Sequence, residues 1–252
     1  MFKYSSRFWL YAPTSLFLLV AIAVMIHWQM SATALEKKLA SLKGKQAIPG
    51  VTIDWSAVEV GGFPFRLDGR FTNFRVQGAG AHGPFTWTAE KFAFHALTYG
   101  RSQTVYEAAG RQQASWTDAK GGAHSTGFLP GSMRASSIQD KEGLRRFDLD
   151  IANMSDAAFT ITRFQFHMRR DPDGQSLDLM LKADKLKTPG FSADNLQIYT
   201  TLSKAGAFAP LLRAEIPWPQ AAARWRAEGG QATFSQVDAA RFAPDTLLSP
   251  LY

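Results

Sequence analysis

The feature that most constrains this chain is an uncharged apolar run near its N-terminus, from Phe8 to Trp28. Folded as an α-helix at about 1.5 Å per residue, the run would extend for about 31 Å, close to the thickness of the hydrocarbon layer of a membrane. Aromatic residues lie at both ends of the run, where amphipathic rings favour the level of the lipid headgroups. We therefore predict a transmembrane helix over residues 8–30, through which the chain binds a membrane.

The short segment before this helix, residues 1–7, contains Lys3 and Arg7 and no acidic residue. Basic residues favour the cytoplasmic side of a membrane, so this segment is expected to be a cytoplasmic tail. Lys37 and Lys38 follow the helix and weaken that assignment. So short a tail still favours a signal-anchor, which exports the part of the chain that follows it.

A cleaved secretory signal is the alternative interpretation of the same helix. Ala32-Thr33-Ala34 matches the A-x-A pattern that signal peptidase recognises a short distance after an apolar run. Cleavage after Ala34 would release a secreted or periplasmic domain. Both interpretations place the rest of the chain outside the cytoplasm. A buried helix of a soluble protein is disfavoured, because the aromatic and basic flanks match a membrane segment.

Residues 31–45 are predicted to form an amphipathic helix that continues from the anchor. Leu35, Leu39 and Leu42 recur at spacings of four and three, charged residues occupy the other faces, and Gly44 is a helix-ending residue. The favoured interpretation is a stalk whose leucines pack on the domain. A basic stripe lying against anionic headgroups is the alternative.

Residues 46–239 repeatedly alternate apolar and polar side chains, which is typical of β-strands with one buried face. The parity of this alternation changes between Phe71 and Phe74 and again between Ala89 and Phe92, which indicates β-bulges. The alternating runs are Val51–Trp55, Phe63–Leu67, Phe85–Ala89, Phe147–Ile151, Phe159–Ile161, Phe164–Met168, Leu177–Leu181 and Leu196–Ile198.

Turn-forming residues separate these runs at Gly78–Pro84, Lys120–Gly122 and Asp171–Gly174. Strands joined by such short turns pair antiparallel. Residues 219–227 favour a short helix that ends at Gly229-Gly230, and residues 240–252 are expected to form an irregular tail. The predicted fold class is mainly β: an N-terminal transmembrane helix, then an antiparallel sheet, curved or folded into a sandwich, with few short helices.

The apolar face of this sheet has two possible roles. It packs on itself as an ordinary core, or it lines a groove that holds an acyl chain. The second role would make a phospholipid or lipid A a partner of the protein.

Composition excludes several classes of function. The chain has no cysteine, which excludes disulfides, iron–sulfur clusters and thiol catalysis. The net charge is +7, but the basic residues are dispersed, so no nucleic-acid partner is expected. A mild basic excess suits a domain close to an anionic membrane surface.

Motifs for catalysis or cofactor binding fail on their context. Gly78–Gly83 matches G-x-G-x-x-G but precedes a predicted strand, whereas a dinucleotide site opens a helix. A calcium loop starting at Asp171 would place Ser176 and Lys182 where glycine and glutamate are required. The five histidines lack a metal-ligand spacing. We therefore expect no catalytic residues, no cofactor and no metal.

One segment resembles a known family. Trp55 is followed by a short predicted strand and then by a G-G-F-P-F-R sequence, and this order after an N-terminal anchor resembles the bacterial domain of unknown function 2125. Similarity to that family continues over residues 87–100 and in a W-x-x-x-G-G pattern near the C-terminus, so the resemblance covers roughly residues 5–235. The residues that carry it, expected to be structural, are Trp55, Gly61, Gly62, Phe63, Pro64, Phe65, Arg66, Trp87, Trp225, Gly229 and Gly230.

The resemblance implies a single-pass protein of the Gram-negative inner membrane, with the bulk of the chain in the periplasm and no assigned enzyme activity. A weaker, fold-level likeness to AsmA-like and lipopolysaccharide-bridge proteins implies a curved sheet that holds lipid. Members of the family usually continue with further strands after the W-x-x-x-G-G pattern. Truncation of the chain therefore stays open, and an exposed sheet edge would be its consequence.

Three functions follow from these observations, in order of preference. The first is a membrane-tethered, non-catalytic envelope domain that binds lipid in an apolar groove. The second is a scaffold module that binds an envelope protein through an exposed patch or sheet edge. The third is an exported hydrolase, which would require a convergent cluster of catalytic side chains.

Overall fold

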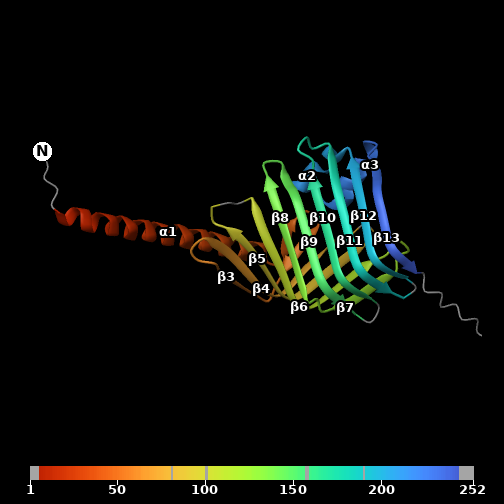
Figure 1. Ribbon diagram of the computed structural model, residues 1–252, viewed down its shortest axis with the longest axis horizontal. Coiled ribbons are helices and arrows are strands. Elements are labelled where there is room, and N and C mark those ends of the chain that lie inside the picture. The colour runs from red at the N-terminus through yellow and green to blue at the C-terminus, as the bar shows by residue number, and fades with distance from the viewer. Residues whose placement is uncertain (1–5, 81, 100–101, 157–158, 190, 244–252) are drawn as a thin grey trace, which may run out of the picture.

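The computed structural model describes residues 6–80, 82–99, 102–156, 159–189 and 191–243. The chain forms one long helix that leads into a single large sheet (Figure 1). The helical elements are α1 (Ser6–Leu42), the 3₁₀ helix η1 (Ala205–Phe208), α2 (Ala209–Leu212) and α3 (Trp218–Ala227). The strands are β1 (Lys45–Ile48), β2 (Val51–Asp54), β3 (Ala57–Gly61), β4 (Arg66–Ala79), β5 (Pro84–Leu97), β6 (Gln103–Thr117), β7 (Ala123–Phe128), β8 (Ser132–Asp140), β9 (Gly143–Ser155), β10 (Thr160–Arg170), β11 (Ser176–Thr188), β12 (Phe191–Ser203) and β13 (Ala232–Ala243).

The sheet confirms the predicted fold class and selects the curved sheet over the sandwich. Its hydrogen-bonded order is β1-β2-β4-β5-β6-β8-β9-β10-β11-β12-β13, with β3 also on β4 and β7 also on β6. The pairings are antiparallel. The sheet bends, so that its first strands and helices α2 and α3 lie behind strands β9 to β12 in the view of Figure 1.

Helix α1 has two parts with different surroundings. Its apolar part projects away from the sheet (Figure 1), and Phe17 and Leu19 there are well exposed. By length and composition, α1 is the one helix among the described residues that could cross a membrane. Its last turns enter the domain, where Leu39 is buried and Leu35 and Leu42 pack beside it. The stalk leucines thus pack on the domain, as in the favoured interpretation.

Several expected boundaries differ from the structure. Helix α1 ends at Leu42 and β1 begins at Lys45, because Gly44 between them has a positive φ of 67°. Strand β13 continues to Ala243, since it pairs with β12 through that residue, so residues 240–243 are not irregular. Residues 1–5 of the expected cytoplasmic tail and residues 244–252 of the expected C-terminal tail lie outside the described residues.

The prediction of a strand over Phe63–Leu67 was wrong in its first half. Strand β3 ends at Gly61 and β4 begins at Arg66, and the residues between them form a turn with a cis Phe63–Pro64 peptide bond. The alternating phenylalanines therefore belong to a turn, where exposure of both side chains is possible. The predicted parity changes do coincide with irregular backbone: Asn73 has a φ of 52°, and the register of β5 shifts between Ala89 and Lys91.

The apolar side chains form two separate clusters. The first joins the end of α1 to the N-terminal strands and contains the buried residues Leu39, Trp55, Phe71 and Phe74. The second joins strands β9 to β12 to the helical segment and is built around Met168, Leu177 and Ala205. Each cluster therefore lies where a helical element covers the sheet.

The bent sheet has an N-terminal arm, β1 to β7, and a C-terminal arm, β8 to β13. The C-terminal helices connect these two arms. Phe208 of η1 is buried, and its ring stacks on Trp218 and Trp225 of α3 at centroid distances of 5.9 and 5.7 Å. Pro217 approaches the β1–β2 turn so closely that a Cβ built on Gly50 would lie 3.0 Å from the Pro217 Cβ. The predicted helix over residues 219–227 is confirmed as α3, whereas η1 and α2 were not predicted.

Candidate functional site

The most extensive candidate site is the inner face of the sheet, the face that packs against α1 at one end and against η1 and α2 at the other. Phe92 and Phe94 on this face pack against the first cluster with Leu39 of α1. On the same face, Phe166 packs against the second cluster together with Leu212 of α2. Apolar residues of every second position along the strands point to this face.

Apolar residues of neighbouring strands lie opposite one another on the inner face. The strand registers connect them in two rows that cross β5, β6, β8, β9, β10, β11 and β12. With about 4.8 Å between strands, each row extends for about 29 Å. The first row, called the central row below, is Phe94, Tyr106, Ala135, Leu149, Phe166, Leu181 and Ile198. The second is Phe92, Ala108, Met133, Ile151, Phe164, Ala183 and Leu196.

The central row is only partly covered. All seven of its residues are half-buried, whereas the second row includes the buried residues Ala108, Ile151 and Ala183. Close-packed domain cores bury most of their large aliphatic side chains. The middle of the inner face therefore keeps apolar surface accessible between the two clusters.

The outer face of the same strands is polar and charged. Arg134 pairs with Glu107 at 3.2 Å, and Arg163 pairs with Asp150 at 2.9 Å. Such ion pairs between exposed side chains add little stability. Their charged groups are nevertheless typical of a sheet face that is exposed to solvent. The inner face is therefore the apolar face of the sheet, and it is only partly covered.

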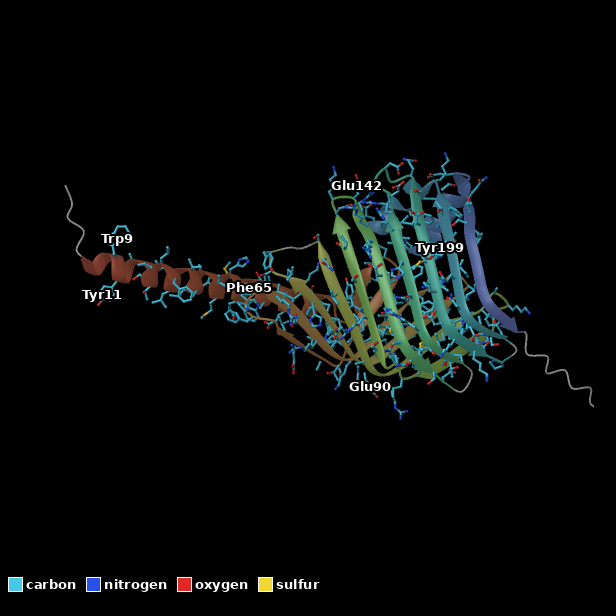
Figure 2. The ribbon with its side chains drawn as sticks, in the orientation of Figure 1. Trp9, Tyr11, Phe65, Glu90, Glu142 and Tyr199 are labelled. Carbon is cyan, nitrogen blue, oxygen red and sulfur yellow. The ribbon has the colours of Figure 1, made fainter. Side chains whose placement is uncertain are left out.

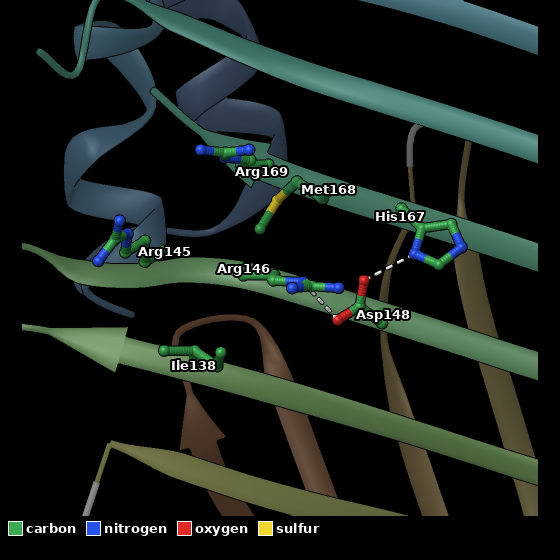
Figure 3. Close-up of a pocket in the computed structure, with 7 residues that line it drawn as sticks. All are labelled: Ile138, Arg145, Arg146, Asp148, His167, Met168 and Arg169. Atoms are coloured by element: carbon green, nitrogen blue, oxygen red, sulfur yellow. Dashed lines mark hydrogen bonds and ion pairs between the residues drawn. The ribbon is translucent and has the colours of Figure 1, made fainter. Parts of the chain in front are cut away.

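A hollow of about 520 Å³ on β8, β9 and β10 is the main polar candidate. Three arginines, one aspartate and one histidine line it, as Figure 3 shows. Asp148 is bonded to His167 at 2.6 Å and to Arg146 at 2.7 Å. Partial burial raises the pKa of the Asp148 carboxyl, but the hydrogen bonds from His167 and Arg146 lower it by more, so the pKa lies below its ordinary value. The lining residues are Ile138, Arg145, Arg146, Asp148, His167, Met168 and Arg169.

Sequence reasoning missed this hollow. Its signal was the pair of arginine doublets at residues 145–146 and 169–170, which an antiparallel hairpin between β9 and β10 brings side by side. Arg146 and Arg169 are direct cross-strand partners. The arrangement offers positive charge at the surface, where salt screens it, so it would hold an anionic group only weakly.

Three histidines form pairs with aspartates, but the pairs lie on different strands. His95 contacts Asp68 at 2.8 Å and His124 contacts Asp118 at 2.7 Å, in addition to the His167 pair. The His124 hydrogen bond lowers the pKa of Asp118 to about 2. Ser136 donates a hydrogen bond to Asp148, whereas a serine nucleophile would have to bond to the imidazole. Among the residues searched, which are the described ones, no three metal-binding side chains lie together.

The G-G-F-P-F-R segment runs from the last residue of β3 to the first residue of β4, and the turn between them folds over a buried carboxylate. Asp68 is fully buried and contacts Arg66 at 2.9 Å, Arg70 at 3.5 Å and His95 at 2.8 Å. Gly62 has a φ of 98°, and a Cβ there would lie 2.8 Å from the carbonyl oxygen of Arg66. Only glycine fits this close approach, so the turn depends on the second glycine of the motif.

The same turn contacts α1. The ring of Trp28 lies edge-on to Phe63 at a centroid distance of 5.4 Å, and its Nε1 donates a hydrogen bond to the Arg66 carbonyl at 2.8 Å. The turn is therefore attached to the end of the apolar run.

A comparison with protein families places the chain. The model of a family described as an uncharacterized protein conserved in bacteria, DUF2125, matches residues 28–241. The chain belongs to this family. Neither the curated proteins nor the solved structures give a match, so the likeness to AsmA-like proteins stays a prediction.

The remaining DUF2125 motif residues lie in two other places. Trp55 is buried against Phe71 at a centroid distance of 5.0 Å. Trp87 packs on the same cluster, and its Nε1 donates a hydrogen bond to Gln112 at 2.9 Å. Both tryptophans thus stabilise the N-terminal arm of the sheet.

The W-x-x-x-G-G pattern ends helix α3 at the opposite end of the domain. Gly229 has a φ of 74° and donates to the carbonyl of Arg226, while Gly230 donates to the carbonyl of Trp225, which together make a Schellman helix end. A Cβ on Gly230 would overlap the Trp225 indole. The DUF2125 motif residues thus occupy three structural positions and do not converge on one site.

Proposed function

We propose that this DUF2125 protein is a membrane-anchored, non-catalytic domain of the bacterial cell envelope whose inner sheet face holds the acyl chain of a lipid. The observation that carries the proposal is the central row of half-buried apolar residues that crosses seven strands. An acyl chain offers no hydrogen-bonding groups, so it is recognised by apolar surface withdrawn from water. The row, at about 29 Å, exceeds the roughly 15 Å depth of one leaflet of the hydrocarbon layer.

The proposed location is the inner membrane, with α1 as a single-pass anchor and the sheet in the periplasm. The exposed apolar part of α1 and the basic residues before it support this orientation. Cleavage after Ala34, which would leave a periplasmic domain, remains the alternative. The partner would be a phospholipid or lipid A, since both carry acyl chains.

Site-specific photocrosslinking in the full chain tests lipid binding. A benzophenone amino acid replaces Leu181 on the inner face or, as a matched control, its neighbour Met180, which is also half-buried but points to the outer face. After irradiation of intact bacterial membranes, we expect mass spectrometry to find lipid adducts at position 181 and few at position 180. Equal labelling at the two positions, or none at either, would count against an acyl chain on the inner face.

A scaffold role is the second candidate, and one observation favours it. Among the described strands, β13 pairs on one side only, with β12. An open strand edge can add a strand from another protein. Protein adducts at a benzophenone amino acid that replaces Phe234 on β13, together with no lipid adducts at position 181, would favour this role.

A further inference from the structure

Three of the exposed aromatic side chains lie together at the end of the domain where α1 enters. Phe63 and Phe65 in the β3–β4 turn are 54% and 58% exposed, and Tyr99 beyond the end of β5 is 75% exposed. Figure 2 shows Phe65 on the side of the sheet that faces the projecting helix. Large apolar rings held in water carry a free-energy cost, so their grouping at one end calls for an explanation. We refer to Phe63, Phe65 and Tyr99 as the aromatic rim.

Hydrogen bonds fix the two turns of the aromatic rim to each other. The carbonyl oxygen of Phe65 accepts hydrogen bonds from both the backbone nitrogen and the side-chain hydroxyl of Thr98, each at 3.0 Å. Tyr99 follows Thr98 directly. Below the turn, the buried Asp68 holds Arg66 at 2.9 Å. The rim is thus built on a rigid base, and its rings are exposed although the backbone beneath them is bonded.

Contact with α1 sets the level of the aromatic rim relative to a membrane. Trp28, the last residue of the apolar run, contacts Phe63 and donates a hydrogen bond to the Arg66 carbonyl. If α1 crosses a bilayer, Trp28 lies at the headgroup level, and the β3–β4 turn must lie at the same level. A partner protein on this surface would have to displace lipid headgroups, whereas the lipid itself is already there.

The charges behind the rim suit the same environment. Arg66 and Arg70 are more than half exposed. Guanidinium groups at this depth would face the phosphates of the headgroups, while the rings reach the boundary of the acyl chains.

We propose that the aromatic rim is a second membrane contact, in which Phe63, Phe65 and Tyr99 insert into the interfacial layer of the bilayer that α1 spans. This proposal rests on the anchoring by α1 that is part of the proposed function, but it does not depend on lipid binding by the inner face. Such a contact would hold the sheet against the membrane in one orientation, whereas a tether alone would allow the domain to rotate away.

Spin labelling of the full chain tests the proposal, and the absence of native cysteines leaves each introduced cysteine as the only label site. Phe63→Cys and Phe65→Cys probe the rim. Trp116→Cys is the matched control, because Trp116 is an exposed aromatic residue on the same sheet, about 40 Å along β6 from Gln103 at about 3.3 Å per residue. Leu18→Cys reports insertion of α1. Each labelled chain is reconstituted into vesicles of phosphatidylcholine and phosphatidylglycerol.

Collision with oxygen, which concentrates in lipid, and with an aqueous nickel chelate gives the depth of each label. We expect the labels at positions 63 and 65 to be several-fold less accessible to the nickel chelate than the label at position 116. Their accessibility should be closer to that of the label at position 18. Labels at 63 and 65 as accessible as the label at 116, with position 18 inside the bilayer, would overturn the rim contact while α1 still anchors the chain. An aqueous label at position 18 would overturn both the anchor and the rim. Unchanged near-ultraviolet circular dichroism of each variant checks that the domain remains folded.

Discussion

The two arms of the sheet use the same alternation of apolar and polar residues but bury their apolar side chains to different extents. In the N-terminal arm, the rings of Phe74 and Phe92 stack at 4.3 Å, and Phe71 lies 5.2 Å from Phe74. In the C-terminal arm, Leu149, Leu181 and Ile198 remain half-buried. The difference follows from what covers each arm: α1 delivers three leucines to the first, whereas η1 and α2 cover only one end of the second.

This contrast separates a core from a candidate binding surface on one continuous face. The strand pattern alone determines which side chains share a face, but not which of them are covered. A covering helix turns the face into a core, whereas the central row between the two clusters keeps part of its apolar surface accessible.

The largest effect is expected from truncating the aromatic core of the N-terminal arm. Trp55→Ala removes a buried ring that contacts Phe71 and Phe74, so we expect it to lower the free energy of unfolding by about 3–5 kcal/mol. Urea unfolding in detergent micelles measures the change. Trp116→Ala, at an exposed tryptophan, should change it by about 0.5 kcal/mol or less. Similar losses for both tryptophans would contradict the packing described for this arm.

A pair of leucine variants compares the two arms directly. Leu39→Ala empties a buried position between α1 and the sheet and should cost about 2–4 kcal/mol. Leu181→Ala, on the half-buried central row, should cost only about 1 kcal/mol, because much of its surface is already in contact with solvent. Equal costs in the same unfolding assay would mean that the C-terminal arm is a closed core, which would count against the lipid proposal.

A glycine variant tests the end of helix α3. Gly230→Ala would drive a methyl group into the Trp225 indole and should lower stability by about 1–3 kcal/mol through overpacking. Gly206→Ala is the matched control, since a Cβ there meets no atom within 4 Å. Thermal unfolding of the two variants should therefore differ. A Gly230→Ala protein as stable as the control would show that the indole moves aside freely.

The smallest effect expected is a dependence of the C-terminal arm on acid. Hydrogen bonds from Arg170 and Arg163 hold the pKa values of Asp140 and Asp150 below the ordinary range, and His167 and Arg146 do so for Asp148 against the effect of burial. These carboxylates stabilise the fold above pH 4 or so, near the ordinary carboxyl pKa, and that contribution is lost as the pH falls further. The hydrogen-exchange protection of the β8 and β9 amides should therefore fall as the pH drops below that range. Asp148→Asn should reduce this dependence of stability on pH. A pH profile that this substitution leaves unchanged would contradict the role given to Asp148.

Local patterns in the sequence predicted the parts of the fold that depend on neighbouring residues. The turn at Asp171–Gly174 joins β10 to β11 through a hydrogen bond from Gly174 to Asp171, and Gly229 ends α3 as expected. These features arise from backbone preferences within a few residues. The same holds for the irregular backbone at Asn73, which the parity of the flanking phenylalanines indicated.

Features that depend on distant contacts could not be predicted in this way. The alternation of Phe63 and Phe65 resembled a strand, but the buried Asp68 and the contact with Trp28 turn the segment into an exposed loop. The arginine hollow requires the β9–β10 register, and the approach of Pro217 to Gly50 requires the whole sheet to bend. The local sequence pattern carries no information about these contacts, because the residues come together only when the whole sheet has formed.

The unbroken course of α1 bears on the timing of any maturation step. Ala32 is 3% exposed, and Ala34 lies within a helix that continues without interruption to Leu42. A peptidase needs an accessible and locally extended backbone, which a docked helix does not offer. Removal of the anchor after Ala34 would therefore have to occur while the chain is still emerging and unfolded. Folding itself would close that opportunity, so the rate of domain folding would decide whether residues 1–34 stay on the chain.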